Sequence, residues 1–155
     1  IMGDSAGGGL TLALLQKIRE LQLTPATGSV LLSPWTDLTA SGDSIKTKKD
    51  ADPLITPYLL EIFTKRYVAN ADPKCPLISP LFADFSDFPP TLIQVGTNEI
   101  LLDDSTRLAQ KMHKQGVKVQ LEIYNNMMHV WQFLAGIVPE ANKAIDEIGE
   151  FVKSL

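Results

Sequence analysis

Near the start of the chain, Gly3-Asp4-Ser5-Ala6-Gly7 fits the pattern G-x-S-x-G, and two more glycines follow at once. In this pattern the serine lies in a sharp turn between a strand and a helix. Small residues two positions on either side let the strand and helix approach closely. The serine hydroxyl then projects into a cleft, and the backbone N–H of Ala6 points toward a developing oxyanion. Because a helical apolar pattern follows directly, we interpret the stretch as a nucleophile elbow rather than a glycine-rich turn that only caps a helix.

Apolar residues recur along the rest of the chain at alternating helical and strand spacing. These patterns predict strands over 29–32, 91–95 and 117–124. They also predict four helices: one with Leu10, Leu14, Ile18 and Leu21 on one side, one after Thr56-Pro57, one from near Asp103 to Gly116, and a last one over 140–153. The last helix has Ala141, Ile145, Ile148 and Val152 on one face. Leucines and phenylalanines interrupt the proline-rich residues 71–90, so we expect an ordered loop docked on the core. Helices alternating with strands predict an α/β fold, in which a mainly parallel sheet has helices on both faces.

Length and composition indicate one globular domain: the chain has 155 residues, of which 45% are hydrophobic and 21% charged. The net charge is -4 and the densest basic run is Lys46, Lys48 and Lys49, so we expect no nucleic-acid partner. No apolar stretch is long enough to predict a membrane span. A single cysteine, Cys75, excludes an intrachain disulfide, a zinc cluster and a CxxC motif. With only two histidines besides, we expect no metal and no cofactor.

Two histidines are candidates for the base that a serine nucleophile requires. His113 falls in a predicted helix, where it is most simply a flanking surface residue. His129 falls in the loop after the last predicted strand, and loops at the carboxyl ends of parallel strands are where such sheets bind ligands. We therefore predict that His129 is the base for Ser5. The alternative is a histidine that only packs its loop.

Three acids compete for the residue that orients this base. Glu99 lies just after the strand predicted over 91–95, at its carboxyl end. Asp103 and Asp104 lie where a helix begins, and an acid there already has a structural role in capping the helix and complementing its dipole. Position therefore favours Glu99, with Asp103 as the alternative.

Apolar residues around the predicted base are candidates for a substrate pocket. They are Met127, Val130, Trp131 and Phe133, and the alternative is that they only pack the loop. Asp4 and Trp35 are further candidates, and each can equally be structural. Cys75 lies among prolines without a neighbouring base, so we expect an ordinary half-buried thiol.

Several segments together resemble one known family. In chain order they are Gly3-Asp4-Ser5-Ala6-Gly7-Gly8, Ser33-Pro34-Trp35-Thr36-Asp37, Asp52-Pro53-Leu54, Ser79-Pro80-Leu81, Glu99-Ile100-Leu101-Leu102-Asp103-Asp104 and His129-Val130-Trp131. With this set, essentially the whole chain resembles the C-terminal half of a bacterial esterase of the hormone-sensitive lipase family. The resemblance implies the α/β-hydrolase fold, with Ser5 as nucleophile and His129 as base.

The chain departs from that family in two places. The family's acid is usually the Asp of a D-P-[LM]-x-D segment, which here reads Glu99-Ile100-Leu101-Leu102-Asp103, so Glu99 takes the acid position and Asp103 stays the runner-up. The family also has a His-Gly-Gly-Gly segment and a mobile N-terminal cap before the elbow, and this chain contains neither. We therefore expect residues 1–155 to form a partial catalytic domain, from the elbow to the C-terminus. With Ala6 as its single oxyanion donor, this chain alone is expected to have little or no activity.

The resemblance implies hydrolysis of short- to medium-chain acyl esters through an acyl-enzyme on Ser5, with a small-molecule ester as the partner. Three alternatives stay open: a catalytically silent binding module of the same fold, a lactone hydrolase of the same family and, last, a peptidase. Family members often dimerise through the last strand and helix, so a homodimer of that kind is carried over as an expectation. A cytoplasmic location is expected as well.

Overall fold

Four parallel strands form the centre of the molecule. The computed structural model describes all of residues 1–155. The strands lie side by side in chain order and are β1 (Met2–Asp4), β2 (Ser29–Leu32), β3 (Thr91–Gly96) and β4 (Val119–Tyr124). Every neighbouring pair is parallel, and Leu31 lies opposite Ile93 in the central pair. The predicted parallel sheet is confirmed, and the carboxyl ends of all the strands meet at one edge.

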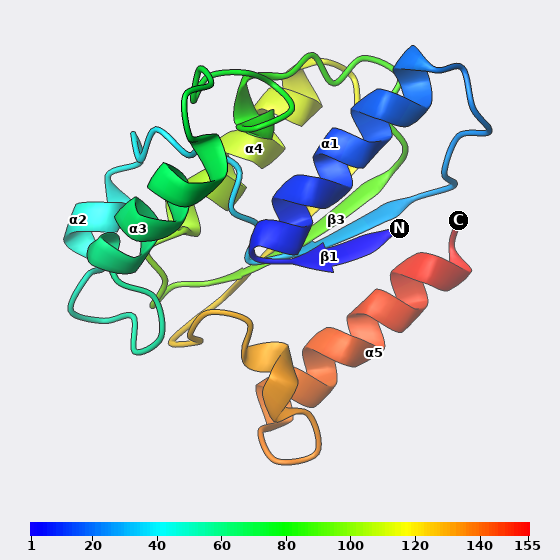
Figure 1. The fold of residues 1–155 in the computed structure, drawn as a ribbon. Coiled ribbons are helices and arrows are strands. Elements are labelled where there is room, and N and C mark those ends of the chain that lie inside the picture. The colour runs from blue at the N-terminus through cyan, green and yellow to red at the C-terminus, as the bar shows by residue number, and fades with distance from the viewer.

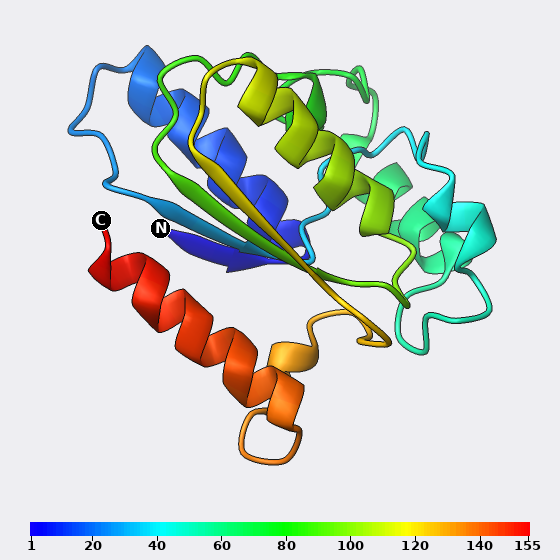
Figure 2. The same cartoon turned by 180° about the vertical axis from the view of Figure 1, so that it is seen from behind.

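Helices cover both faces of this sheet (Figure 1). α1 (Ala6–Glu20) and α4 (Leu102–Lys114) lie on one face and α5 (Pro139–Lys153) lies on the other, as the reverse view also shows (Figure 2). α2 (Ser44–Thr47) and α3 (Pro57–Val68) lie beyond the carboxyl ends of the strands. Two short 3-10 helices, η1 (Pro80–Phe82) and η2 (Trp131–Leu134), occur in the connecting segments. The predicted α/β class is therefore confirmed.

Alternate residues of the central strands supply two separate cores. Leu31 packs with Leu108 in the core that α1 and α4 cover. Leu92 packs with Ile148 in the core that α5 covers. Burial on both faces explains why the strand over 29–32 is continuously apolar in sequence. Each buried leucine side chain contributes about 1.5–3 kcal/mol to folding.

The proline-rich segment between α3 and β3 is ordered, as predicted. Its residues Leu81, Phe85 and Phe88 are buried in the same core as α1 and α4. The Phe85 and Phe88 rings meet edge to face, with centroids 5.2 Å apart. The segment is therefore part of the domain rather than a linker.

The apolar stripe that the sequence predicts on α1 is not the side that packs on the sheet. Leu10 and Leu21 are each 64% exposed, whereas Leu12 and Leu15 are buried. Near its start the helix buries only small residues, namely Gly8, Gly9 and Thr11. Because the elbow brings the start of α1 against the sheet, only small side chains fit between them, and the stripe that contains Leu10 faces outward.

The last helix has nearly the predicted range, but its buried stripe is shifted. It buries Ala141, Ala144, Ile148 and Phe151. Ile145 and Val152, which were predicted to share a face with Ala141 and Ile148, are 44% and 54% exposed. The shift places the large Phe151 ring in the core instead of the smaller Val152 side chain, and an aromatic ring gains more from burial.

Candidate active site

Ser5 lies in the turn between β1 and α1, with backbone angles φ 50° and ψ -121°. A serine at positive φ is strained, and the surrounding main chain holds it in place. The Ser5 N–H donates to the Leu32 carbonyl at 2.9 Å, and the Ser5 carbonyl accepts from the Trp35 N–H at 2.9 Å. The carboxyl end of β2 therefore holds the elbow from both sides.

Glycines allow the close contacts that this elbow makes. A Cβ added to Gly3 would lie 2.2 Å from the Gly7 carbonyl oxygen, and a Cβ added to Gly9 would lie 2.4 Å from the Trp35 carbonyl oxygen. At Gly7 the nearest atom would be 3.8 Å away, so a side chain there would fit. Gly3 and Gly9 are therefore positions where a larger side chain would clash with the main chain, and Gly9 lies outside the five-residue pattern.

Three of the predicted residues form one hydrogen-bonded chain. His129 Nε2 lies 2.9 Å from Ser5 Oγ, and His129 Nδ1 lies 3.0 Å from Glu99 Oε2. His129 is 4% exposed and Glu99 is fully buried. Ser5 follows β1, Glu99 follows β3 and His129 follows β4. The carboxyl edge of the parallel sheet therefore brings the three residues together.

Two further donors hold the Glu99 carboxylate. Its other oxygen, Oε1, accepts from the Gly96 N–H at 2.6 Å and from the Ser33 hydroxyl at 2.8 Å. Each carboxylate oxygen is thus hydrogen-bonded, as a buried carboxylate requires. Sequence reasoning did not identify Ser33 as part of this site, although its position directly after a buried parallel strand was a usable signal.

The competing acids are used elsewhere. Asp103 Oδ2 accepts from the Ser44 N–H at 2.9 Å, at the start of α2. Asp104 Oδ2 accepts from the N–H groups of Thr36 and Asp37 at 2.7 and 2.9 Å. Burial raises the pKa of Asp104 to about 7. Both aspartates therefore fasten the segment between β2 and α3 to α4, and neither reaches the imidazole.

A second buried carboxylate, Asp37, is held in its charged form. Burial alone would raise its pKa, but hydrogen bonds from Ser41 and Thr39 and the charge of Arg107 outweigh burial, so the pKa lies below its ordinary value. Arg107 Nη1 lies 3.1 Å from Asp37 Oδ2. This ion pair links the segment after β2 to α4, close to the protonatable Asp104.

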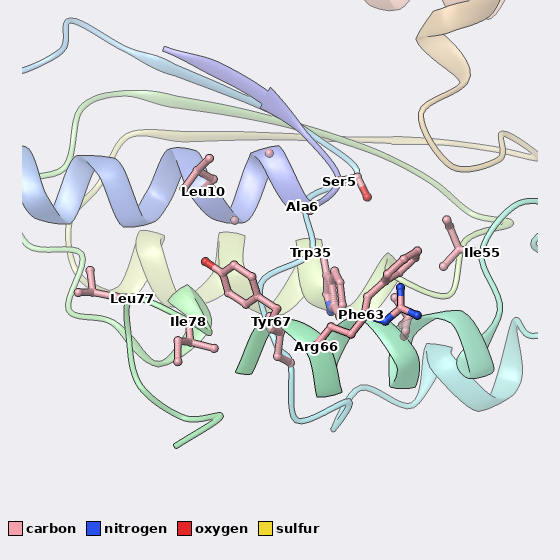
Figure 3. A pocket seen from close by; sticks show the side chains of 14 residues that line it. Ser5, Ala6, Leu10, Trp35, Ile55, Phe63, Arg66, Tyr67, Leu77 and Ile78 are labelled. Atoms are coloured by element: carbon pink, nitrogen blue, oxygen red, sulfur yellow. The ribbon is translucent and has the colours of Figure 1, made fainter. Parts of the chain in front are cut away.

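An apolar cavity of about 650 Å³ opens beside Ser5. It lies between the start of α1 and α3, and Figure 3 shows Ser5 and Ala6 on one side and Phe63 and Tyr67 of α3 on the other. Its other apolar lining residues include Leu10, Trp35, Ile55 and Ile78. The exposed leucine stripe of α1 thus contributes Leu10 to the wall of this cavity.

Apart from Trp35, the residues proposed from sequence for a pocket do not line this cavity. Trp131 is fully buried against the Tyr124 ring, with centroids 4.8 Å apart. Met127 packs in the same cluster and Val130 is also buried, whereas Phe133 is 78% exposed. Asp4 is exposed at the elbow and is not part of the cavity wall either. The sequence predicted the helix α3 but not its place in the cavity wall, because nothing local links residues 57–68 to the elbow.

Ala6 occupies the position expected of an oxyanion donor. It is the first residue of α1 and lines the cavity beside Ser5. The first N–H groups of a helix have no intrahelical acceptor, and the helix dipole favours negative charge near them. The Ala6 amide therefore lies at the N-terminal end of α1, directly after Ser5, where the sequence predicts an oxyanion donor.

The remaining histidine, cysteine and acidic side chains form no metal-binding group. No group of three or more His, Cys, Asp or Glu side chains is placed to hold a metal ion. Cys75 is a free, partly buried thiol, as expected. His113 is exposed on α4. None of the helices combines the length and apolar character needed to cross a bilayer.

A serine, a histidine and a buried carboxylate at the carboxyl ends of three parallel strands define an α/β-hydrolase type of site. Comparison with known proteins agrees. The alpha/beta hydrolase fold family matches residues 1–133, and the chain belongs to this family.

Relatives of known name are esterases and related hydrolases. An acetyl-hydrolase of Streptomyces hygroscopicus is 39% identical over 154 residues, which are 99% of this chain and 52% of that protein. An esterase of Acinetobacter venetianus is 38% identical over 156 residues, covering 100% of this chain and 52% of its own length. The crystal structure of a hormone-sensitive lipase from a metagenome library superposes with a TM-score of 0.96 at 44% identity, over 99% of this chain and 53% of that chain.

The sequence motifs predicted a resemblance to bacterial esterases of the hormone-sensitive lipase family, and these relatives confirm it. The chain spans about half the length of the relatives it matches. The activity of those whole proteins therefore supports a proposal about this chain and does not establish its activity.

Proposed function

We propose that this chain carries the nucleophile, base and acid of a serine carboxylesterase that acts on short- to medium-chain acyl esters. The observation that carries the proposal is the hydrogen-bonded chain from Ser5 through His129 to Glu99, which ends at an apolar cavity. The names of the relatives, an acetyl-hydrolase and an esterase among them, support the same reaction class.

In the first half of the reaction, the Ser5 hydroxyl attacks the ester carbonyl carbon while His129 Nε2 takes its proton. Glu99 accepts from the Nδ1–H and stabilises the imidazolium. The carbonyl oxygen becomes an oxyanion, toward which the Ala6 N–H is directed. The C–O bond to the alcohol then breaks, His129 returns the proton to the leaving alkoxide, and the acyl group stays on Ser5.

In the second half, water attacks the acyl-enzyme and His129 takes one of its protons. The bond to Ser5 Oγ breaks, the proton returns to Ser5, and the carboxylic acid leaves. The chemistry uses one base twice, which requires that the imidazole keep a fixed orientation through both halves. The buried Glu99 carboxylate supports that requirement, because three hydrogen bonds hold it.

The shape and polarity of the cavity support an acyl substrate. Ten of its fourteen lining residues are hydrophobic, and the cavity begins at Ser5. Each methylene transferred from water to such a wall contributes about 0.8 kcal/mol. A volume of about 650 Å³ holds a short or medium acyl chain, and this supports the proposed substrate class.

The proposal is tested in the intact polypeptide that contains this sequence. The p-nitrophenyl esters of acetic, butyric, octanoic and dodecanoic acid are offered to the wild type and to Ser5→Ala. We expect hydrolysis by the wild type, with a preference for the shorter esters, and loss of turnover in Ser5→Ala without loss of the folded circular-dichroism spectrum. Hydrolysis retained by Ser5→Ala contradicts the proposal.

A serine-reactive phosphonate distinguishes the esterase from a catalytically silent binding module. The esterase predicts a covalent adduct on the peptide that contains Ser5, seen by mass spectrometry, and no adduct in Ser5→Ala. A folded wild type that takes no label and hydrolyses no ester favours the silent module. Hydrolysis of lactones but not of open-chain esters favours the lactone hydrolase.

We also propose a homodimer through β4 and α5. β4 is an edge strand, and Ile123 on it is 47% exposed. The unpaired backbone N–H and C=O groups of an edge strand favour pairing with another chain, and a further charged residue there opposes it. Sedimentation analysis is expected to give a dimer for the wild type and a monomer for Ile123→Lys; a monomeric wild type contradicts this arrangement.

A further inference from the structure

Ser33 occupies an unusual backbone position next to the site. It directly follows β2, is fully buried and has a φ of 45°. Its N–H donates to the Gln94 carbonyl of β3 at 2.8 Å. A residue other than glycine in the left-handed region is held there by its surroundings, and such positions concentrate at functional sites.

The Ser33 hydroxyl makes two hydrogen bonds, and both end on groups of the site. It donates to Glu99 Oε1 at 2.8 Å and accepts from the Val130 N–H at 3.2 Å. Val130 directly follows His129 and itself has a φ of 51°, which is an outlier for a β-branched residue. One hydroxyl therefore joins the acid to the backbone that carries the base.

Ser33 fastens the histidine loop on the side of β2. On the side of β3, the same loop is tied by the Asn98 N–H, which donates to the Met127 carbonyl at 3.0 Å, and by the Asn126 N–H, which donates to Thr97 Oγ1 at 2.8 Å. These bonds do not touch the Glu99 carboxylate. Besides the hydrogen bond from the His129 ring itself, the Ser33 hydroxyl is thus the contact that links the acid to the backbone of this loop.

The serine at the other end of the same strand provides a comparison. Ser29 is 1% exposed, and its hydroxyl lies 2.8 Å from Thr91 Oγ1. Both Ser29 and Ser33 are buried hydroxyls bonded to a side chain from another part of the chain. Only Ser33 bonds to groups of the site.

We infer that Ser33 is a positioning residue for the proposed reaction: its hydroxyl fixes the rotation of the Glu99 carboxylate and the backbone after His129 in one arrangement. This inference rests on the proposed function. Without the hydroxyl, Glu99 Oε1 keeps only the Gly96 N–H, and the Val130 N–H loses its acceptor. A small misplacement of a reacting group lowers the rate strongly, so we expect kcat to fall roughly 10- to 100-fold.

The first experiment compares Ser33→Gly, Ser33→Ala and Ser29→Ala in the intact polypeptide, with p-nitrophenyl butyrate. Glycine adopts a positive φ without strain, so Ser33→Gly removes the hydroxyl and leaves the backbone conformation accessible. We expect both Ser33 variants to lose kcat while KM stays near the wild-type value, because Ser33 does not line the cavity. Ser29→Ala controls for the loss of a buried hydroxyl and is expected to lower the melting temperature but not kcat. A wild-type kcat in Ser33→Gly overturns the inference.

A double-mutant cycle with Glu99→Ala separates positioning from a general loss of stability. If Ser33 acts through Glu99, then adding Ser33→Gly to Glu99→Ala lowers kcat little further. Losses that multiply in the double variant overturn the inference that Ser33 fixes the rotation of the Glu99 carboxylate, because they show that Ser33 acts independently of the acid.

A spectroscopic measurement keeps this test separate from the test of the proposed function. The low-field proton resonance of His129 Nδ1–H reports its hydrogen bond to Glu99, and it is expected to shift or broaden in Ser33→Gly and to stay unchanged in Ser29→Ala. If the wild type hydrolyses no ester, the proposed function fails, yet the resonance still tests Ser33. An unchanged resonance in Ser33→Gly overturns the inference.

Discussion

The backbone of Gly96 touches the backbone of Met127: a Cβ added to Gly96 would lie 2.1 Å from the Met127 carbonyl oxygen and 3.0 Å from Glu99 Oε1. The end of β3 and the loop that carries His129 therefore meet main chain to main chain. Because Glu99 follows the same strand and bonds to the Gly96 N–H, this contact sets the separation of the acid and the base.

Gly96→Ala is expected to displace the histidine loop. The added methyl group must move either the loop or the Glu99 carboxylate, so we expect kcat for a p-nitrophenyl ester to fall roughly 100-fold. Overpacking of this kind also lowers the free energy of unfolding by about 1–3 kcal/mol. Steady-state kinetics and urea unfolding measure the two effects.

Gly149→Ala is the matched control for this change. Gly149 lies within α5, and a Cβ there would meet nothing within 4 Å. Alanine in a helix interior is more favourable than glycine by about 0.5–1 kcal/mol, so this variant is expected to be more stable with unchanged kcat. Equal activity of Gly96→Ala and Gly149→Ala would show that the contact with Met127 does not position the site.

Glu99→Gln is expected to lower kcat far more than Asp103→Asn. The glutamine amide keeps the shape of the side chain but loses the negative charge that stabilises the imidazolium, a loss worth roughly 10³- to 10⁴-fold in comparable triads. Asp103 contacts the start of α2 through Ser44, so its variant is expected to lose stability but keep kcat. The reverse order of the two kcat values would make Asp103 the acid.

Leu10→Trp is expected to narrow the cavity and shift the acyl preference toward acetate. Leu10 is 64% exposed and lines the cavity, so a larger side chain there removes space without disturbing the core. We expect kcat/KM for the octanoate ester to fall roughly 10-fold more than for the acetate ester. The control is Phe133→Ala, which removes a candidate pocket residue that lies outside the cavity. If Phe133→Ala changes the acyl preference and Leu10→Trp does not, the acyl group binds near Phe133, beside the loop that carries His129, and not in the cavity.

Asp104→Asn is expected to change how stability depends on pH. Burial raises the pKa of folded Asp104 to about 7, above its ordinary value of 3.8. The folded state therefore binds more protons than the unfolded state between these values, and the free energy of unfolding falls as the pH rises through this window, by up to about 4 kcal/mol. Below the window and above it, the contribution of Asp104 is constant.

The asparagine side chain does not titrate, and its oxygen can still accept from Thr36 and Asp37. Urea unfolding of the intact polypeptide across this pH range should therefore show Asp104→Asn gaining stability over the wild type as the pH rises. The difference between the two proteins isolates Asp104 from other groups with raised pKa values, such as the partly buried Glu122. Parallel curves for the two proteins would mean that Asp104 does not change its charge in this range.

The three residues of the hydrogen-bonded chain were predictable, because each carries a local signal, whereas most of the residues predicted for the pocket do not line the cavity. Ser5 lies in a motif, and Glu99 and His129 each follow a predicted strand in the chain order of the fold class. Ser33 follows a predicted strand as well, but a serine after a strand is common, and only its contacts with Glu99 and Val130 distinguish it. The roles of these residues in catalysis stay predictions until the variants are measured.

Local patterns in the chain were enough to predict the strands and the approximate ranges and order of the longer helices, because periods of two and of about 3.6 residues are local properties. The short helix α2 (Ser44–Thr47) was not predicted. The same patterns did not predict which side of α1 faces the sheet, nor that α3 lies across the cavity from Ser5. A period shows which residues share a face, but several faces of α1 carry leucines. The choice between them depends on backbone contacts such as Gly9 against Trp35, which lie far apart in the chain and exist only once the sheet has formed.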